Sequence, residues 1–234
     1  MNIERILQTR TSRKTRGGHP LNIFRESFNE IKAACLAIEN NELPKFSHLL
    51  ERSAIISLVT SIEVYYRDML DGVFRHCKHS FFSPLVKHFC KTKYDIDDLI
   101  VFHEKQIHPL ELVASQLNFQ NIEAIDAVFS KVIGRGFFSS LLDLRIRVRG
   151  KPETESGFVP ADLDALKRVF AVRHEIVHSP AHQCSYLNKT LVEDIDRVGW
   201  VIYGSDTLLM KVINDNLDDE VAEMSAKKQR QESK

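Results

Sequence analysis

The sequence lacks several features that would define a class of function at once. Its 234 residues carry 32 basic and 32 acidic side chains, so the formal net charge is zero. This balance excludes a protein that is basic all over, the usual footprint of a nucleic-acid binder, but it does not exclude local basic patches. The four cysteines are spread out, with no CxxC pair among them.

Long hydrophobic segments are also absent. The longest apolar run, over residues 54–62, is interrupted by Ser57, Thr60 and Ser61 and falls far short of the ~20 residues of a membrane span. The chain opens with polar residues, without the apolar segment of a signal peptide. We therefore expect a cytoplasmic protein with reduced thiols and no membrane contact.

Glycine-rich phosphate loops and dinucleotide fingerprints are missing as well. The nearest approach, Gly134-Arg135-Gly136, has neither a preceding strand pattern nor a third glycine. We expect no cofactor.

The chain divides by composition into three parts. Residues 1–20 form a basic arm, residues 215–234 are a charged tail with little to bury, and residues 21–214 form one domain. We expect the arm and the tail to be mobile or disordered.

The middle of the chain has the apolar spacing of helices, with few alternating strand patterns. The main helices are expected over residues 21–38, 44–76, 161–178 and 187–217. Breaks are expected near residues 83–84, 108–109 and 134–136, a loop over 149–160, and one short strand candidate within 144–148. The predicted fold is an all-α helical bundle.

Two charged residues interrupt apolar helical stripes. Glu63 is the only charge in a stripe of the second helix, and Arg173 is the only charge in a stripe of the helix over 161–178. The two stripes consist of Ile56, Val59, Glu63, Tyr66, Leu70 and Val73, and of Leu163, Leu166, Phe170, Arg173 and Val177. Burying a lone charge is costly, so the pair forms either a core salt bridge or a cleft in which Arg173 meets an anion.

A first motif, His174-Glu175-Ile176-Val177-His178, matches the HExxH pattern of zinc hydrolases. There, two histidines at i and i+4 bind zinc and the glutamate activates water. His182 is the candidate third ligand, but its spacing is unusual and Pro180 ends the helix just after the second histidine. The pattern fixes only three positions, so chance matches are common.

A second motif, Arg-x4-His, overlaps the first and runs from Arg173 to His178. An acidic residue followed by aromatics stands on the earlier long helix, in Ser61-Ile62-Glu63-Val64-Tyr65-Tyr66-Arg67-Asp68. Together with residues 172–179 and the long helix after them, this resembles the HEPN superfamily, whose signature is Arg, four to six residues, then His near a helix end. The resemblance covers roughly residues 50–213, with extra helices inserted between the two motif-bearing helices.

The resemblance implies a metal-independent endoribonuclease that cleaves RNA by attack of the ribose 2′-hydroxyl. It implies a toxin or phage-defence effector that acts as a homodimer, with a possible regulatory or antitoxin partner. Arg173 would hold the scissile phosphate, His178 would be general acid or base, His174 would assist, and Glu63 would position Arg173. The alternative is a non-catalytic interaction module of the same fold, in which His178 caps the helix.

The spacing of the second motif raises a geometric question. Residues five apart on an ideal helix point ~140° away from each other. Either the helix unwinds before Pro180, or the site is composite across a dimer axis.

Two further groups of residues are candidates for binding. Arg145, Arg147, Arg149 and Lys151 alternate with apolar residues. This pattern predicts either an extended edge whose basic face contacts RNA phosphates, or a basic loop that is exposed to solvent. The histidines and cysteines within residues 76–90 are zinc-ligand types, but their spacing matches no common site, and we expect no metal there.

Overall fold

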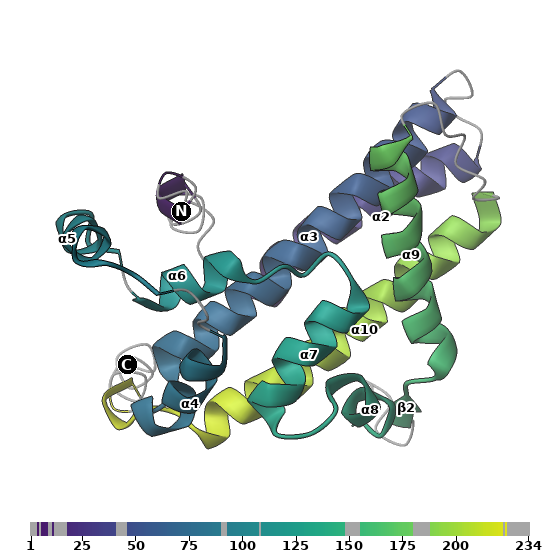
Figure 1. Ribbon diagram of the computed structural model, residues 1–234. Coiled ribbons are helices and arrows are strands. Elements are labelled where there is room, and N and C mark those ends of the chain that lie inside the picture. The colour runs from purple at the N-terminus through teal and green to yellow at the C-terminus, as the bar shows by residue number, and fades with distance from the viewer. Residues whose placement is uncertain are drawn as a thin grey trace, which may run out of the picture. The chain divides into compact units, whose positions relative to one another are not determined.

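The computed structural model describes residues 4, 6–8, 11, 18–40, 46–89, 93–107, 109–147, 155–179, 188–221 and 223. Helices dominate these residues, which confirms the all-α prediction (Figure 1). The helices are α2 (Pro20–Glu39), α3 (Ser47–His76), α4 (His79–Phe89), α5 (Ile96–Glu104), α6 (Pro109–Gln116), α7 (Ile122–Ile133), α8 (Phe137–Leu142), α9 (Pro160–His178) and α10 (Asn188–Asp215). Two short strands, β1 (Arg145–Arg147) and β2 (Glu155–Gly157), pair antiparallel.

The chain forms two compact units. One comprises residues 1–17, 67–117 and 209–234, and the other comprises residues 18–66 and 118–208. The boundaries fall inside α3 and α10, so each of these long helices contributes residues to both units.

The core of the second unit is aromatic. Tyr66 on α3 is fully buried, and its ring centroid lies 5.3 Å from that of Phe129 and 6.2 Å from that of Phe137. Its hydroxyl lies 2.9 Å from the Ser205 hydroxyl of α10. On the other side of α3, α2 runs alongside, with Phe24 edge-on to Tyr65 at 6.0 Å (Figure 1). The candidate functional residues of α9 all belong to this unit.

The first unit has its own smaller cluster. Ile6, Phe102, Ile107 and Leu112 are buried together. Where α3 and α10 end, Cys77 and Leu217 form an antiparallel bridge. The Lys78 N–H donates to the Asn216 carbonyl at 2.9 Å, and the Asp218 N–H donates to the His76 carbonyl at 2.7 Å. Backbone N–H and carbonyl groups that have no intrahelical partner at the ends of α3 and α10 thus form hydrogen bonds with each other.

The ends of the helices follow the expected chemistry at several places. Pro109 and Pro160 each begin a helix, where the missing N–H is not needed. Gly134 follows α7 with φ +75°, a left-handed conformation that favours glycine. The breaks expected near residues 108–109 and 134–136 are therefore confirmed, as is a strand within residues 144–148.

Two local predictions were wrong. The break expected near Ser83-Pro84 does not occur, since Pro84 lies inside α4. Pro84 and Ser80, four residues earlier, are both exposed residues, and at an exposed position solvent can replace the intrahelical hydrogen bond that proline removes. In the loop expected over residues 149–160, Glu155–Gly157 forms β2, because the hairpin partner β1 supplies the hydrogen bonds.

Substitution by alanine is expected to change the free energy of unfolding in opposite directions at two glycines in the interiors of long helices. At Gly204 a Cβ would lie 2.5 Å from Leu141 Cδ1 and closer still to Phe158, both buried. At Gly72 the nearest atom, Ile213 Cδ1, is 3.8 Å away. We expect Gly72→Ala to raise the free energy of unfolding by about 0.5–1 kcal/mol through helix propensity.

Gly204→Ala, in contrast, should lower the free energy of unfolding by about 1–3 kcal/mol, because buried neighbours must move. Urea unfolding of the two variants and the wild type measures both changes. Equal stabilisation by the two substitutions would contradict the close packing at Gly204.

A buried carboxyl group lies near the start of α3. Glu51 is only 4% exposed, and its Oε1 has no hydrogen-bond partner in the described part of the chain. Its Oε2 lies 3.9 Å from Nδ1 of the exposed His48. Burial raises the pKa of Glu51 to about 7.

Glu51 should make the protein less stable as the pH rises. In the unfolded chain this carboxyl ionises near pH 4.5, whereas in the fold it keeps its proton to about pH 7. Between these values folding takes up a proton, so the free energy of unfolding falls by about 3 kcal/mol from this group and stays level above pH 7. Glu51→Gln should remove this slope in urea unfolding at pH 5 and pH 8, whereas the exposed Glu30→Gln should keep it.

Candidate functional site

Helix α9 is fixed at its start by a shared carboxylate. Val159 precedes the helix in extended conformation, and its N–H donates to Asp162 Oδ2 at 2.9 Å. The other oxygen of Asp162 accepts from Arg197 Nη1 of α10 at 3.0 Å. Asp162 is buried, and these contacts supply the partners that a buried carboxylate requires.

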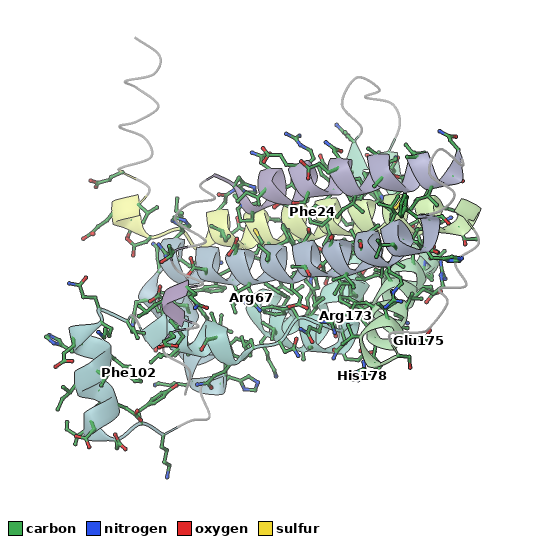
Figure 2. All side chains as sticks on the ribbon, turned by 90° about the horizontal axis from the view of Figure 1, so that it is seen from above. Phe24, Arg67, Phe102, Arg173, Glu175 and His178 are labelled. Carbon is green, nitrogen blue, oxygen red and sulfur yellow. The ribbon has the colours of Figure 1, made fainter. Side chains whose placement is uncertain are left out.

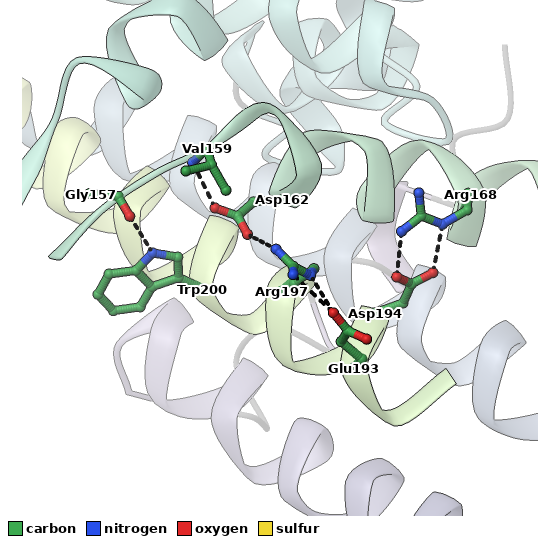
Figure 3. A network of polar contacts seen from close by, with 8 residues as sticks. All are labelled: Gly157, Val159, Asp162, Arg168, Glu193, Asp194, Arg197 and Trp200. Atoms are coloured by element: carbon green, nitrogen blue, oxygen red, sulfur yellow. Dashed lines mark hydrogen bonds and ion pairs between the residues drawn. The ribbon is translucent and has the colours of Figure 1, made fainter. Parts of the chain in front are cut away.

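Further polar contacts hold α9 against α10 (Figure 3). Arg168 donates to both oxygens of the buried Asp194, with Nε at 2.9 Å from Oδ2. Arg197 also pairs with Glu193 on its own helix at 2.9 Å. Bidentate guanidinium–carboxylate contacts fix orientation as well as distance. These contacts in the first half of α9 therefore hold the helix against α10 and position its C-terminal residues.

The C-terminal part of α9 carries the predicted site residues (Figure 2). The helix is continuous to His178, and the Ser179 N–H still donates to the Glu175 carbonyl at 2.8 Å. The helix therefore does not unwind before Pro180, the first of the two solutions considered from sequence. On this continuous helix Arg173 and His178 point ~140° apart.

His174 and His178 are brought together. Both are exposed, and their ring centroids lie 4.3 Å apart with an angle of 53° between the planes. This contact follows from the i, i+4 spacing on one helix face. Arg173 immediately precedes His174, so the arginine and the two histidines all lie in the C-terminal part of α9.

Arg173 is half-buried, at the margin of the apolar face of α9. Within the residues that the structure describes, it makes no hydrogen bond or ion pair, with Glu63 or with any other carboxylate. Its guanidinium is therefore available to an anion.

The description of Glu63 and Arg173 as charges buried in the middle of apolar stripes was wrong. Glu63 is half-buried and Ile56 of the same stripe is 39% exposed, as is Val177 at 47% in the stripe of Arg173. The rest of the α3 stripe is buried, as is the neighbouring stripe; all of these residues are at most 1% exposed: Val59, Tyr66, Leu70 and Val73 in the first, and Ile55, Leu58, Ile62, Tyr65 and Met69 in the second. Because α3 is buried over a wide arc, Ile56 and Glu63 lie at the margin of that arc, and apolar spacing alone does not show which members of a stripe are covered.

A pocket of about 550 Å³ lies between α9 and the segment that enters α7, and we call it the α7–α9 pocket. Lys167, Arg173, His174 and Glu175 line it from α9. The facing wall consists of Asn118, Gln120, Asn121, Ile122 and Glu123. Phe170 and Ala171 of α9 also line it. Of the imidazole pair, His174 lines the pocket and His178 does not.

The facing wall was not recognised from the sequence. Its only signal is the amide-rich stretch Asn118-Phe119-Gln120-Asn121 in front of a helix. Such residues are ordinary at a helix start, and Asn121 does cap α7, accepting from the Ala124 N–H at 2.7 Å.

The basic tract of the sequence lies on the hairpin. Arg145 donates to the carbonyl groups of Leu142 and Leu144 at 3.0 and 3.1 Å. Arg147 pairs with Glu155 of β2 at 3.4 Å. Arg149 and Lys151 lie outside the described residues, and contact of this tract with RNA stays a prediction.

The described part of the chain shows neither a metal site nor a reactive cysteine. No group of three His, Cys, Asp or Glu side chains there has the geometry of a metal site, and His182 lies outside it. Burial raises the pKa of the Cys35 and Cys77 thiols to about 11, so neither is a nucleophile at neutral pH. Among the described helices, none is long and apolar enough to cross a bilayer.

Comparison of the chain with protein-family models, with curated proteins and with solved structures gives no match.

Proposed function

We propose that this protein is a metal-independent endoribonuclease of HEPN type that acts as a homodimer. The observation that supports this most directly is the end of α9, where Arg173, which makes no ion pair among the described residues, directly precedes the imidazole pair of His174 and His178 in the chain. These are the residue types that phosphodiester transesterification requires.

The reaction requires three catalytic groups from the protein: a base, an acid and a cation. A base takes the proton of the ribose 2′-hydroxyl, whose oxygen attacks the neighbouring phosphorus. An acid gives a proton to the departing 5′-oxygen, leaving a 2′,3′-cyclic phosphate and a 5′-hydroxyl. A cation stabilises the charge that develops on the phosphoryl oxygens, and arginine does this bidentately. Imidazoles exchange protons near neutral pH, and we assign His178 and His174 to these transfers, with Arg173 on the phosphate.

The geometry of α9 favours a site shared between two copies. Attack and departure occur on opposite sides of the phosphorus, but His174 and His178 lie side by side on one helix face. One helix thus supplies acid–base groups to one side of the phosphate only. A two-fold axis near the end of α9 would place the same residues of a second copy on the other side.

The same pair of imidazoles favours a second candidate, a zinc hydrolase. Histidines at i and i+4 with adjacent rings can bind one metal ion, with Glu175 as the base. A third candidate is the non-catalytic interaction module, which predicts association without cleavage.

One experiment separates the three functions. Single-stranded RNA is incubated with the full chain in EDTA, and the products are analysed for 2′,3′-cyclic phosphate ends. We expect cleavage in EDTA, blocked by 2′-deoxy substitution at the cleaved position. His178→Ala should reduce the rate by about 10²–10⁴-fold, and the exposed His88→Ala on α4 should leave it unchanged.

The contrary outcomes are equally specific. Cleavage that EDTA abolishes and zinc restores would replace this proposal by the hydrolase. A folded protein that dimerises but cuts no RNA would replace it by the interaction module.

A further inference from the structure

We propose that the α7–α9 pocket is a base-binding subsite that selects guanine next to the cleaved phosphate. The inference rests on the proposed function for its place beside the reaction. The pocket volume of about 550 Å³ is in the range of sites for small ligands such as a nucleotide. Arg173 and His174 line both the pocket and the candidate reaction site, so a nucleotide in the pocket adjoins the phosphate that they contact.

The facing wall supplies hydrogen-bond donors. Asn118 Oδ1 accepts from the Gln120 N–H at 2.9 Å, and Asn121 Oδ1 accepts from the Ala124 N–H at 2.7 Å. Only an oxygen can accept these bonds, so the backbone fixes the orientation of both amides. Each amide is thereby left with its NH₂ group, and both residues line the pocket.

The same wall supplies an acceptor. Glu123 is an exposed residue of the first turn of α7, and it makes no ion pair or hydrogen bond through its carboxylate among the described residues. A carboxylate accepts through two oxygens side by side, so it matches a ligand that presents two adjacent N–H donors.

Guanine has the edge that complements this wall. Its N1–H and 2-amino group are adjacent donors for the Glu123 carboxylate, and its O6 and N7 are acceptors for amide NH₂ groups. Adenine and cytosine each present one amino donor on that edge, and uracil presents one N–H between two acceptors. A carboxylate beside amide donors therefore discriminates for guanine.

Lys167 and Arg173 favour the nucleotide over the bare base. Both are cationic residues of α9 on the opposite wall. Lys167 lies 3.5 Å from Asp164, an exposed contact that screens little of its charge. A 3′-phosphate on the bound guanosine meets these two side chains.

The test is calorimetric titration of the full chain with 3′-GMP, 3′-AMP, 3′-CMP and 3′-UMP at low salt. We expect 3′-GMP to bind about tenfold tighter than the others. Glu123→Gln should remove that preference, and the exposed Glu26→Gln should keep it. Asn121→Asp keeps the oxygen that caps α7 and loses the NH₂ donor, so it should weaken 3′-GMP binding in a folded protein.

Equal binding of the four nucleotides, or a preference that survives Glu123→Gln, would overturn the subsite. This result is separable from failure of the nuclease. RNA cleavage without guanine preference would keep the proposed function and remove the subsite. Selective binding of 3′-GMP without any cleavage would keep the subsite and remove the nuclease.

Discussion

Arg173→Ala is expected to lower the rate of RNA cleavage by about 10²–10³-fold, the effect of removing one strong electrostatic contact to a developing oxyanion. The guanidinium makes no ion pair in the described part of the chain, so its removal leaves no carboxylate without a partner. The free energy of unfolding should therefore change little. Single-turnover cleavage of an RNA oligonucleotide and urea unfolding of the same preparation measure the two effects.

Two further variants make this expectation specific. Arg173→Lys keeps the charge but loses the planar pair of donors, so it should recover only part of the rate. Arg25→Ala removes an exposed arginine of α2 and should cleave like the wild type. A rate for Arg173→Ala within threefold of the wild type would contradict the assignment of Arg173 to the phosphate.

Tyr66→Ala is expected to lower the free energy of unfolding by about 3–5 kcal/mol, a large part of the roughly 5–15 kcal/mol by which folded domains are stable. Tyr66 is fully buried, and its ring contacts Phe119, Phe129 and Phe137 at centroid distances of 6.3, 5.3 and 6.2 Å. Truncation to Cβ removes the central ring of this cluster. Thermal and urea unfolding followed by circular dichroism measures the loss.

Tyr66→Phe separates the ring from its hydroxyl. The Ser205 hydroxyl already donates to the Val201 carbonyl at 2.8 Å, so Tyr66 is the donor in the contact between the two hydroxyls. The phenylalanine variant loses that single hydrogen bond and should be destabilised by only about 1 kcal/mol. Equal losses for the two variants would mean that the hydroxyl, not ring packing, determines the stability at this position.

The sequence was sufficient for the fold class and for the long helices, because their apolar spacing and terminal prolines act locally. The helix expected over 161–178 begins at Pro160 and ends at His178, as its flanking residues indicate. Pro84 shows the limit of such rules. A proline early in a short helix is tolerated where its surroundings are exposed, and exposure is set by the fold.

The site was predictable only in part. The motif located Arg173, His174 and His178 on one helix, and periodicity alone required that the two histidines meet. The wall formed by residues 118–123 was not predictable, because the packing of α7 against α9 brings distant parts of the chain together. The exposure of Glu63 and Arg173 likewise depends on which arc of a broadly apolar helix is covered.

The backbone bridge between Cys77 and Leu217 has a consequence for the order of folding. Its partners are separated by most of the chain, so closing this loop is entropically unfavourable until both long helices exist. Each helix must also end at the right residue, since a shift of one position would misalign the hydrogen bonds of His76 and Asn216. The bridge is therefore expected to form late. An amide-exchange experiment should find the N–H groups of Lys78 and Asp218 protected after those in the middle of α3.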